Sequence, residues 1–292
     1  NLKTGISFPK ARAKALDEYF KKYNLDYSLN INSNNYAKYP SDITSNSNLD
    51  INTFINQPNN ILGIEYIKAL MRFNSKINPV PLKRLGAGYH SLDTGTKLAS
   101  ATGIRTAMAN KDNISGLLPD NCLNIIKNHT TIEYNDFSTV LGSKLLSMDT
   151  LDHIEGINQD LSNRIANNKY NFTDIETFIP MLQSKNYTYS AISRALLHII
   201  LDIKTDDIKE FVNNNYAMIL GFTKKSGVLS EISKSTKIPL VSKFATFYKE
   251  ADNNQRKMLD INLKADNLYR MIYMNKTGET LPTEFQRQII IF

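Results

Sequence analysis

Apolar residues recur at helical spacing along most of this chain, with polar residues between them. In residues 8–23 and 58–74 the apolar side chains return every three or four positions, which predicts two amphipathic helices. Asn59 and Asn60 stand at the start of the second helix, so an asparagine cap is expected there.

A strand, a loop and a third helix should follow. Residues 77–85 place Val80 and Leu82 among prolines, which predicts a short strand with the prolines near its start or on an edge. A new helix is expected to begin with Ser100 or Thr102 as its cap.

The rest of the chain is mainly helical in pattern, with a small β element. Helices are predicted over residues 121–128, 136–146 and 260–274, a helix-loop-helix over 160–203, a short buried strand at 238–243, and a buried apolar end at 289–292. We expect one domain over 1–112, containing an asparagine-rich insert at 24–56, and a mainly helical domain over 113–292. The predicted fold class is α/β, predominantly helical.

Composition narrows the class of protein. Hydrophobic residues make up 41% of 292 residues, and the mean hydropathy is −0.34. No apolar run approaches the roughly 20 residues that a membrane span needs, so no membrane association is expected. Cys122 is the only cysteine, which excludes an internal disulfide and a thiolate zinc cluster and favours a cytoplasmic location. The four histidines are scattered, so no metal site is predicted.

Positive charge is concentrated in one segment. Residues 58–111 hold eight Lys and Arg against two acidic residues, while the whole chain carries a net charge of +7. This concentration indicates a polyanionic partner rather than a generally basic surface.

The same segment has the features of a phosphate site. Arg84 lies at the end of the predicted strand, where open α/β sheets usually bind ligands. Gly86 and Gly88 permit close backbone approach. A helix beginning near Ser100, with Arg105 one turn in, would present unpaired amides to an anion. Taken singly, each of these residues also has a purely structural interpretation as a cap, a turn or a surface charge.

Several motifs, in order and spacing, resemble one known family. They include LKTGISFPKARAKAL, PNNILGIEYIKAL, KRLGAGYH, LASATGIR, EGINQDLSNRI and SKNYTYSAISRALLHIILDI. Together they resemble the bacterial tRNA(Met) cytidine acetate ligases, a branch of the nucleotidyltransferase-like superfamily. The HxGH-like motif of that family's Rossmann half does not occur here, so the chain resembles the C-terminal portion of such a protein. We therefore expect the fragment alone to be incomplete as an enzyme.

The resemblance implies ATP-dependent acetylation of the wobble cytidine of elongator tRNA(Met), with acetate, ATP and Mg²⁺ as partners. By position, it implies that Asn59 and Arg84 contact the nucleotide. Gly86, Gly88 and His90 would shape the pocket, and Ser100, Thr102 and Arg105 would form the phosphate side. It identifies no catalytic residue.

A second group of residues is a candidate for holding tRNA. Lys185, Tyr187 and Thr188 occupy the loop of the helix-loop-helix, and Arg194 lies on the polar side of the next helix, an arrangement suited to gripping an RNA backbone. Packing alone is the structural alternative for Tyr187.

Two other functions remain open at this point. Besides an acetate ligase, the chain could be a tRNA-binding module without catalysis or part of a small-metabolite adenylyltransferase that does not bind RNA. Binding of tRNA without binding of ATP would favour the tRNA-binding module. ATP binding that tRNA does not affect would favour the adenylyltransferase.

Overall fold

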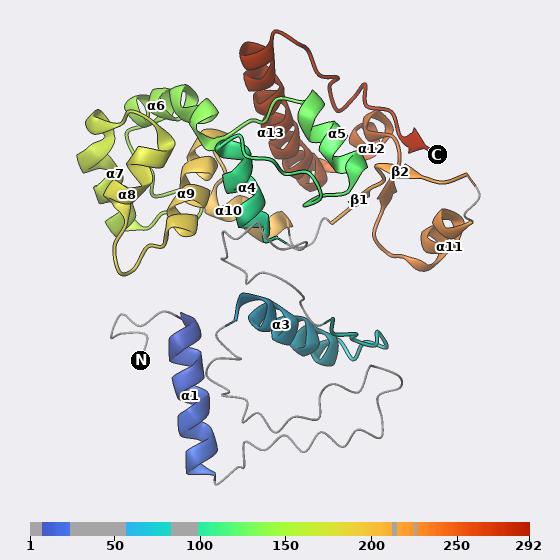
Figure 1. Cartoon of the computed structure of the whole chain (residues 1–292), viewed down its shortest axis with the longest axis horizontal. Coiled ribbons are helices and arrows are strands. Elements are labelled where there is room, and N and C mark those ends of the chain that lie inside the picture. Colours follow the sequence, from blue (N-terminus) through green and yellow to red (C-terminus); the bar gives the residue numbers. More distant parts are fainter. Residues whose placement is uncertain (1–7, 24–56, 83–98, 212–214, 225–226) are drawn as a thin grey trace. The chain divides into compact units, whose positions relative to one another are not determined.

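The computed structural model describes residues 8–23, 57–82, 99–211, 215–224 and 227–292 (Figure 1). The chain divides into two compact units, residues 1–124 and 125–292. The first contains the helices α1 (Phe8–Lys22), α3 (Pro58–Arg72) and α4 (Ala101–Ala109), and α5 (Asp120–Asn128) crosses the division. The domain boundary predicted near residue 112 stays a prediction.

The second unit is mainly helical, as its sequence pattern predicts. Its helices are η3 (Tyr134–Phe137), α6 (Ser138–Ser147), α7 (Gln159–Asn168), η4 (Lys169–Asn171), α8 (Ile175–Leu182), α9 (Tyr189–Leu201), α10 (Thr205–Phe211), α11 (Val228–Ser235), α12 (Phe244–Glu250) and α13 (Asn253–Thr277). Its strands have two residues each: β1 (Ala217–Met218), β2 (Gly221–Phe222), β3 (Leu240–Val241) and β4 (Ile290–Ile291). The predicted strand at 238–243 is confirmed as β3.

In the first unit, α1 and α3 are joined by an ion pair. Arg12 Nη1 of α1 lies 3.2 Å from Glu65 Oε1 of α3, and the neighbouring Ala11 and Ala13 are buried. The lysines of α1 lie in solvent, but so does Tyr19, at 53% exposure. The helix predicted over residues 8–23 is therefore confirmed as α1, whereas its apolar positions are only partly buried.

The start of α3 differs from the prediction. Gln57 is the N-cap, its side chain makes no capping hydrogen bond, and Pro58 begins the helix. Asn59 thus lies inside the first turn and is not the cap. Proline is favoured at this first position because its missing N–H has no partner in the helix in any case.

The predicted strand over residues 77–85 does not form where the structure describes it. The chain leaves α3 through Asn74, whose φ is +47°, and residues 77–82 have no regular secondary structure. Pro79 and Pro81 each lack an amide donor, so this stretch is poorly suited to a strand ladder. Residues 83–98, which include the glycine loop, lie outside the described part of the chain.

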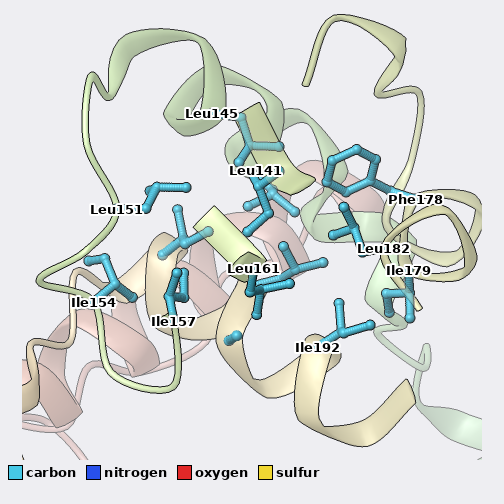
Figure 2. Packing of buried hydrophobic residues seen from close by; sticks show 14 of the residues in the cluster. Leu141, Leu145, Leu151, Ile154, Ile157, Leu161, Phe178, Ile179, Leu182 and Ile192 are labelled. Carbon is cyan, nitrogen blue, oxygen red and sulfur yellow. The ribbon is translucent and has the colours of Figure 1, made fainter. Parts of the chain in front are cut away.

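One continuous apolar core holds α6, α7, α8 and α9 together. Figure 2 shows Leu141 and Leu145 of α6 facing Leu161, Phe178 and neighbouring side chains. These residues are buried, with Leu141 and Phe178 at 0% exposure. Partly buried Phe137, Val140 and Tyr187 pack against the same core. The helix predicted over residues 136–146 is therefore confirmed, and its apolar face lies in this core.

The strands form two separate parallel pairs. β1 pairs with β3, and β2 pairs with β4. Gly221 lets β4 approach, since a Cβ at this position would lie 2.7 Å from the Ile290 carbonyl oxygen. The backbone at the end of the chain is therefore paired, but Ile290, Ile291 and Phe292 are 59%, 51% and 77% exposed. The prediction that these side chains are buried was wrong, because β4 is held through its main chain.

Candidate functional site

The N-terminus of α4 contains three residues of the predicted nucleotide site, Ser100, Thr102 and Arg105. Ser100 is the N-cap: its Oγ accepts a hydrogen bond of 2.9 Å from the Gly103 amide, and the residue is fully buried. This confirms the predicted helix start. Ala101 and Thr102 follow in the first turn, where an amide has no carbonyl partner within its own helix.

One face of α4 is exposed to solvent and the other is buried. Arg105 is exposed, Thr102 is half-buried, and Ala107 lies in the interior. The guanidinium of Arg105 is thus on the helix surface, one turn beyond the cap. The positive end of the helix and this cation together suit an anion chemically.

The other predicted nucleotide contacts are only partly described. Asn59 is exposed in the first turn of α3. Arg84, Gly86, Gly88 and His90 lie outside the described residues, and their assignments stay predictions.

In the second unit, the loop before α9 is fixed by hydrogen bonds. The Tyr187 hydroxyl donates to Asn158 Oδ1 at 2.5 Å, and the same oxygen caps α7 by accepting from the Leu161 amide at 3.0 Å. Thr188 caps α9, with its Oγ1 accepting from the Ala191 amide at 3.3 Å. Tyr187 and Thr188 therefore hold the loop in place.

Two cations of this region face solvent. Lys185 lies exposed in the loop, and Arg194 lies exposed on α9. Their side chains are available to a ligand, whereas the hydroxyls of Tyr187 and Thr188 are engaged within the protein. The structure thus separates the four predicted RNA contacts into two that shape the loop and two that project from it.

A turn at Gly156 packs beside α9, and the spacing of residues along the sequence did not predict this contact. Gly156 has φ of +80°, and the preceding Glu155 carbonyl lies 2.8 Å from His198 Nδ1. His198 is therefore satisfied by a backbone contact. The motif EGINQ was the only sequence signal for this arrangement, because the two partners are far apart along the chain.

Neither a metal site nor a membrane span is found among the described residues. No group of three His, Cys, Asp or Glu in this part of the chain is arranged to hold a metal ion. No helix among them is both long and apolar enough to cross a bilayer. A ligand set for Mg²⁺ therefore cannot be named from the described side chains.

Comparisons with known proteins place these features in one family. The family model described as "HIGH Nucleotidyl Transferase" matches residues 1–283. A tRNA(Met) cytidine acetate ligase of Thermoanaerobacter sp. (strain X514) is 31% identical over 284 residues, covering 94% of this chain and 64% of that protein. The protein of the same name from Halothermothrix orenii (strain H 168) is 30% identical over 286 residues, covering 92% and 63%. The chain thus spans a little under two thirds of the length of these relatives.

Solved structures share the fold. The crystal structure of Thermotoga maritima TmcAL (apo, form I) has a TM-score of 0.78 at 23% identity and covers 100% of this chain and 68% of that one. The form of TmcAL bound with alpha-thio ATP gives the same score and identity and covers 99% and 67%. The helical architecture with few short strands is therefore that of a known fold, and the match over residues 1–283 shows that this chain belongs to the HIGH nucleotidyl transferase family.

Proposed function

We propose that this protein acts in the ATP-dependent acetylation of the wobble cytidine of elongator tRNA(Met), giving N4-acetylcytidine. The observation that carries the proposal is that acetate ligases of this name match more than nine-tenths of the chain at 30–31% identity. A related structure is described as bound with alpha-thio ATP, which supports an ATP site in the present chain as well.

The proposed reaction has two group transfers. An acetate oxygen attacks the α-phosphorus of ATP, which forms acetyl-adenylate and releases pyrophosphate. The N4 amine of cytidine then attacks the acetyl carbonyl, which forms the amide and releases AMP with loss of a proton. Both steps depend on orienting the reactants and on stabilising phosphate charge, so fixed donors and cations are the main requirement.

In this proposal the N-terminus of α4 holds the phosphates of ATP. Ser100 fixes the first turn by its bond to the Gly103 amide, which leaves the amides of Ala101 and Thr102 at the positive end of the helix. Arg105 adds a cation one turn further on. Asn59 and Arg84 contact the nucleotide, and Gly86, Gly88 and His90 shape the pocket. Mg²⁺ accompanies ATP as its usual counterion.

The loop before α9 provides the RNA contacts in this proposal. Lys185 and Arg194 are exposed and pair with backbone phosphates, whereas Tyr187 and Thr188 position the loop through their hydrogen bonds. Each phosphate contact adds to the salt dependence of binding without selecting a sequence. The RNA substrate and ATP are both cytoplasmic, which sets the proposed location.

The test measures N4-acetylcytidine in elongator tRNA(Met) after incubation of the full-length protein with acetate and ATP. We expect product only when all three substrates are present, and a loss of at least tenfold in rate for Arg84→Ala. Lys76→Ala is the matched control, because Lys76 is an exposed cation of the same basic segment. Full activity of Arg84→Ala would show that the role assigned to Arg84 is wrong.

Binding and product measurements on the same protein distinguish the other two functions. Binding of tRNA(Met) with no ATP binding and no product identifies a binding module. ATP binding that tRNA leaves unchanged, again with no product, identifies an adenylyltransferase for a small metabolite. Either result would overturn the proposed activity.

A further inference from the structure

A cleft lies between α13 and the segment that follows it. Figure 1 shows the chain leaving α13 and turning back toward α12 and β2. The cavity between them measures about 250 Å³ and is lined on the α13 side by Asp266, Tyr269 and Arg270. The spacing of these three residues places them on one face of the helix. Glu284 and Arg287 line the opposite side.

The cleft has a fixed geometry. Arg270 Nε donates to the Leu281 carbonyl at 2.9 Å, which ties the returning segment to α13. The same guanidinium donates through Nη1 to Asn267 at 3.2 Å. Arg270 is therefore held by both walls, and the cavity does not depend on a freely moving side chain.

Glu284 is the unusual group in this cleft. It is only 8% exposed, and its Oε2 has no hydrogen bond. Arg287 Nη1 lies 3.1 Å from this oxygen, but no guanidinium N–H is aligned for a hydrogen bond. Oε2 is inaccessible and pairs with Arg287 by charge, so it holds this guanidinium, whose side chain is 51% exposed, at the cleft.

The balance of charges in the cleft disfavours binding of a phosphate group. Asp266 and Glu284 balance Arg270 and Arg287, so the formal charge of the lining is zero. A polyanion gains little from such a lining, because its two cations are balanced by two carboxylates. A neutral group that carries both donors and acceptors matches it, since carboxylates accept and guanidinium groups donate.

The side chain of Tyr269 favours a planar ligand. Tyr269 is 42% exposed at the cleft, and its ring stacks on that of Tyr273 at 6.5 Å between centroids with 21° between planes. An exposed ring supported from behind provides a platform on which a planar group can stack. The cavity volume suits one ring system and excludes a duplex.

We propose that this cleft binds a single unpaired nucleobase of an RNA substrate, stacked on Tyr269 and hydrogen-bonded by Arg287, which Glu284 holds in place. The inference rests on the proposed function in that it takes the substrate to be RNA. It goes further by assigning a base-binding subsite to the second unit. Every nucleobase carries acceptors on its edge, and these would match the donors of the Arg287 guanidinium.

The test measures the Kd of this chain for a hairpin of the tRNA(Met) anticodon arm and for the four nucleoside 5′-monophosphates. Glu284→Gln keeps the shape but removes the charge that holds Arg287, and Tyr269→Ala removes the platform. Base stacking on an aromatic side chain is worth about 1–3 kcal/mol. We therefore expect Tyr269→Ala to raise the Kd for the hairpin by at least about fivefold, and Glu284→Gln to raise it in the same range.

The matched control is Tyr170→Ala, because Tyr170 is an 80% exposed tyrosine of the same unit and lies outside the cleft. A perfectly paired RNA duplex should bind equally to all variants, since its bases are not available for stacking. Should Glu284→Gln unfold, Tyr269→Ala still carries the test because its side chain is exposed.

The outcomes separate the two proposals. Hairpin or nucleotide binding that is weakened by both variants supports the base site, and the preferred monophosphate identifies the base. Binding that both variants leave unchanged overturns the base site, as does a wild-type chain that binds neither probe. Nucleotide binding that depends on Glu284, in a full-length protein that forms no N4-acetylcytidine, would refute the proposed activity and leave the base site intact.

Discussion

The hydroxyl of Tyr187 joins two parts of the second unit that are 29 residues apart. It donates to Asn158 Oδ1 at 2.5 Å, and that oxygen also caps α7 through the Leu161 amide. Tyr187→Phe removes the hydroxyl alone and keeps the ring against the core. This variant therefore tests whether Tyr187 positions the loop or contacts RNA directly.

The expected loss follows from the geometry. One intramolecular hydrogen bond contributes about 0.5–1.5 kcal/mol net. Asn158 keeps its bond to Leu161 in the variant, so no acceptor is left without a partner. We expect Tyr187→Phe to lower the free energy of unfolding by about 1 kcal/mol. The Kd for tRNA(Met) should change by less than about twofold, a free-energy difference of about 0.4 kcal/mol.

Urea denaturation followed by circular dichroism gives the stability, and a filter-binding titration gives the Kd. Tyr189→Phe is the control, because Tyr189 is 42% exposed at the start of α9 and lies two residues further along the chain. The reasoning is refuted if Tyr187→Phe keeps full stability but weakens tRNA binding by tenfold or more. That result would place the hydroxyl on the RNA.

Three further predictions concern stability. Burial raises the pKa of Asp136, but the Glu133 amide and the Lys276 ammonium outweigh this and leave the pKa below its ordinary value. The stabilisation is therefore present above the unfolded pKa of about 3.9 and is lost as pH falls through the folded pKa. Asp136→Asn should cost about 1 kcal/mol at pH 7 in urea denaturation, and this cost should shrink as the pH falls below about 3.9; a cost that does not change with pH would contradict the ion pair. Gly156→Ala should lower the unfolding free energy by about 1–2 kcal/mol because φ is +80°, and an unchanged melting curve would show that the turn relaxes. Ser100→Ala should cost about 1 kcal/mol through the lost cap, whereas Ser100→Thr should retain most of the stability.

Much of the helical structure was predictable from the sequence. The period of apolar residues predicted helices of the core, among them the helix over residues 136–146 that carries the buried Leu141 and Leu145. The Ser100 cap was also predictable, because a serine before a helical stretch is a local signal. The predicted strand after α3 failed because the preference of Val80 and Leu82 for extended structure was weaker than the effect of two prolines.

The candidate sites were less predictable, because they depend on contacts between distant residues. Nothing in the spacing indicated that Asn158 would bind the Tyr187 hydroxyl, or that Glu155 would satisfy His198. Nothing in the sequence marked Asp266, Tyr269 or Arg270, in the helix predicted over residues 260–274, as lining a cavity. Their role in a cavity required the return of the chain beside α13.

The sequence by itself determined the local structure of this protein and its family, since helical periodicity, capping residues and motif order are carried by neighbouring positions. The tertiary structure alone decided which polar groups are engaged and which are open to a ligand. It used the hydroxyls of Tyr187 and Thr188 within the protein, and it left Lys185 and Arg194 exposed. The physical reason is that burial and hydrogen bonding depend on which segments meet in space, and local propensity does not determine those meetings.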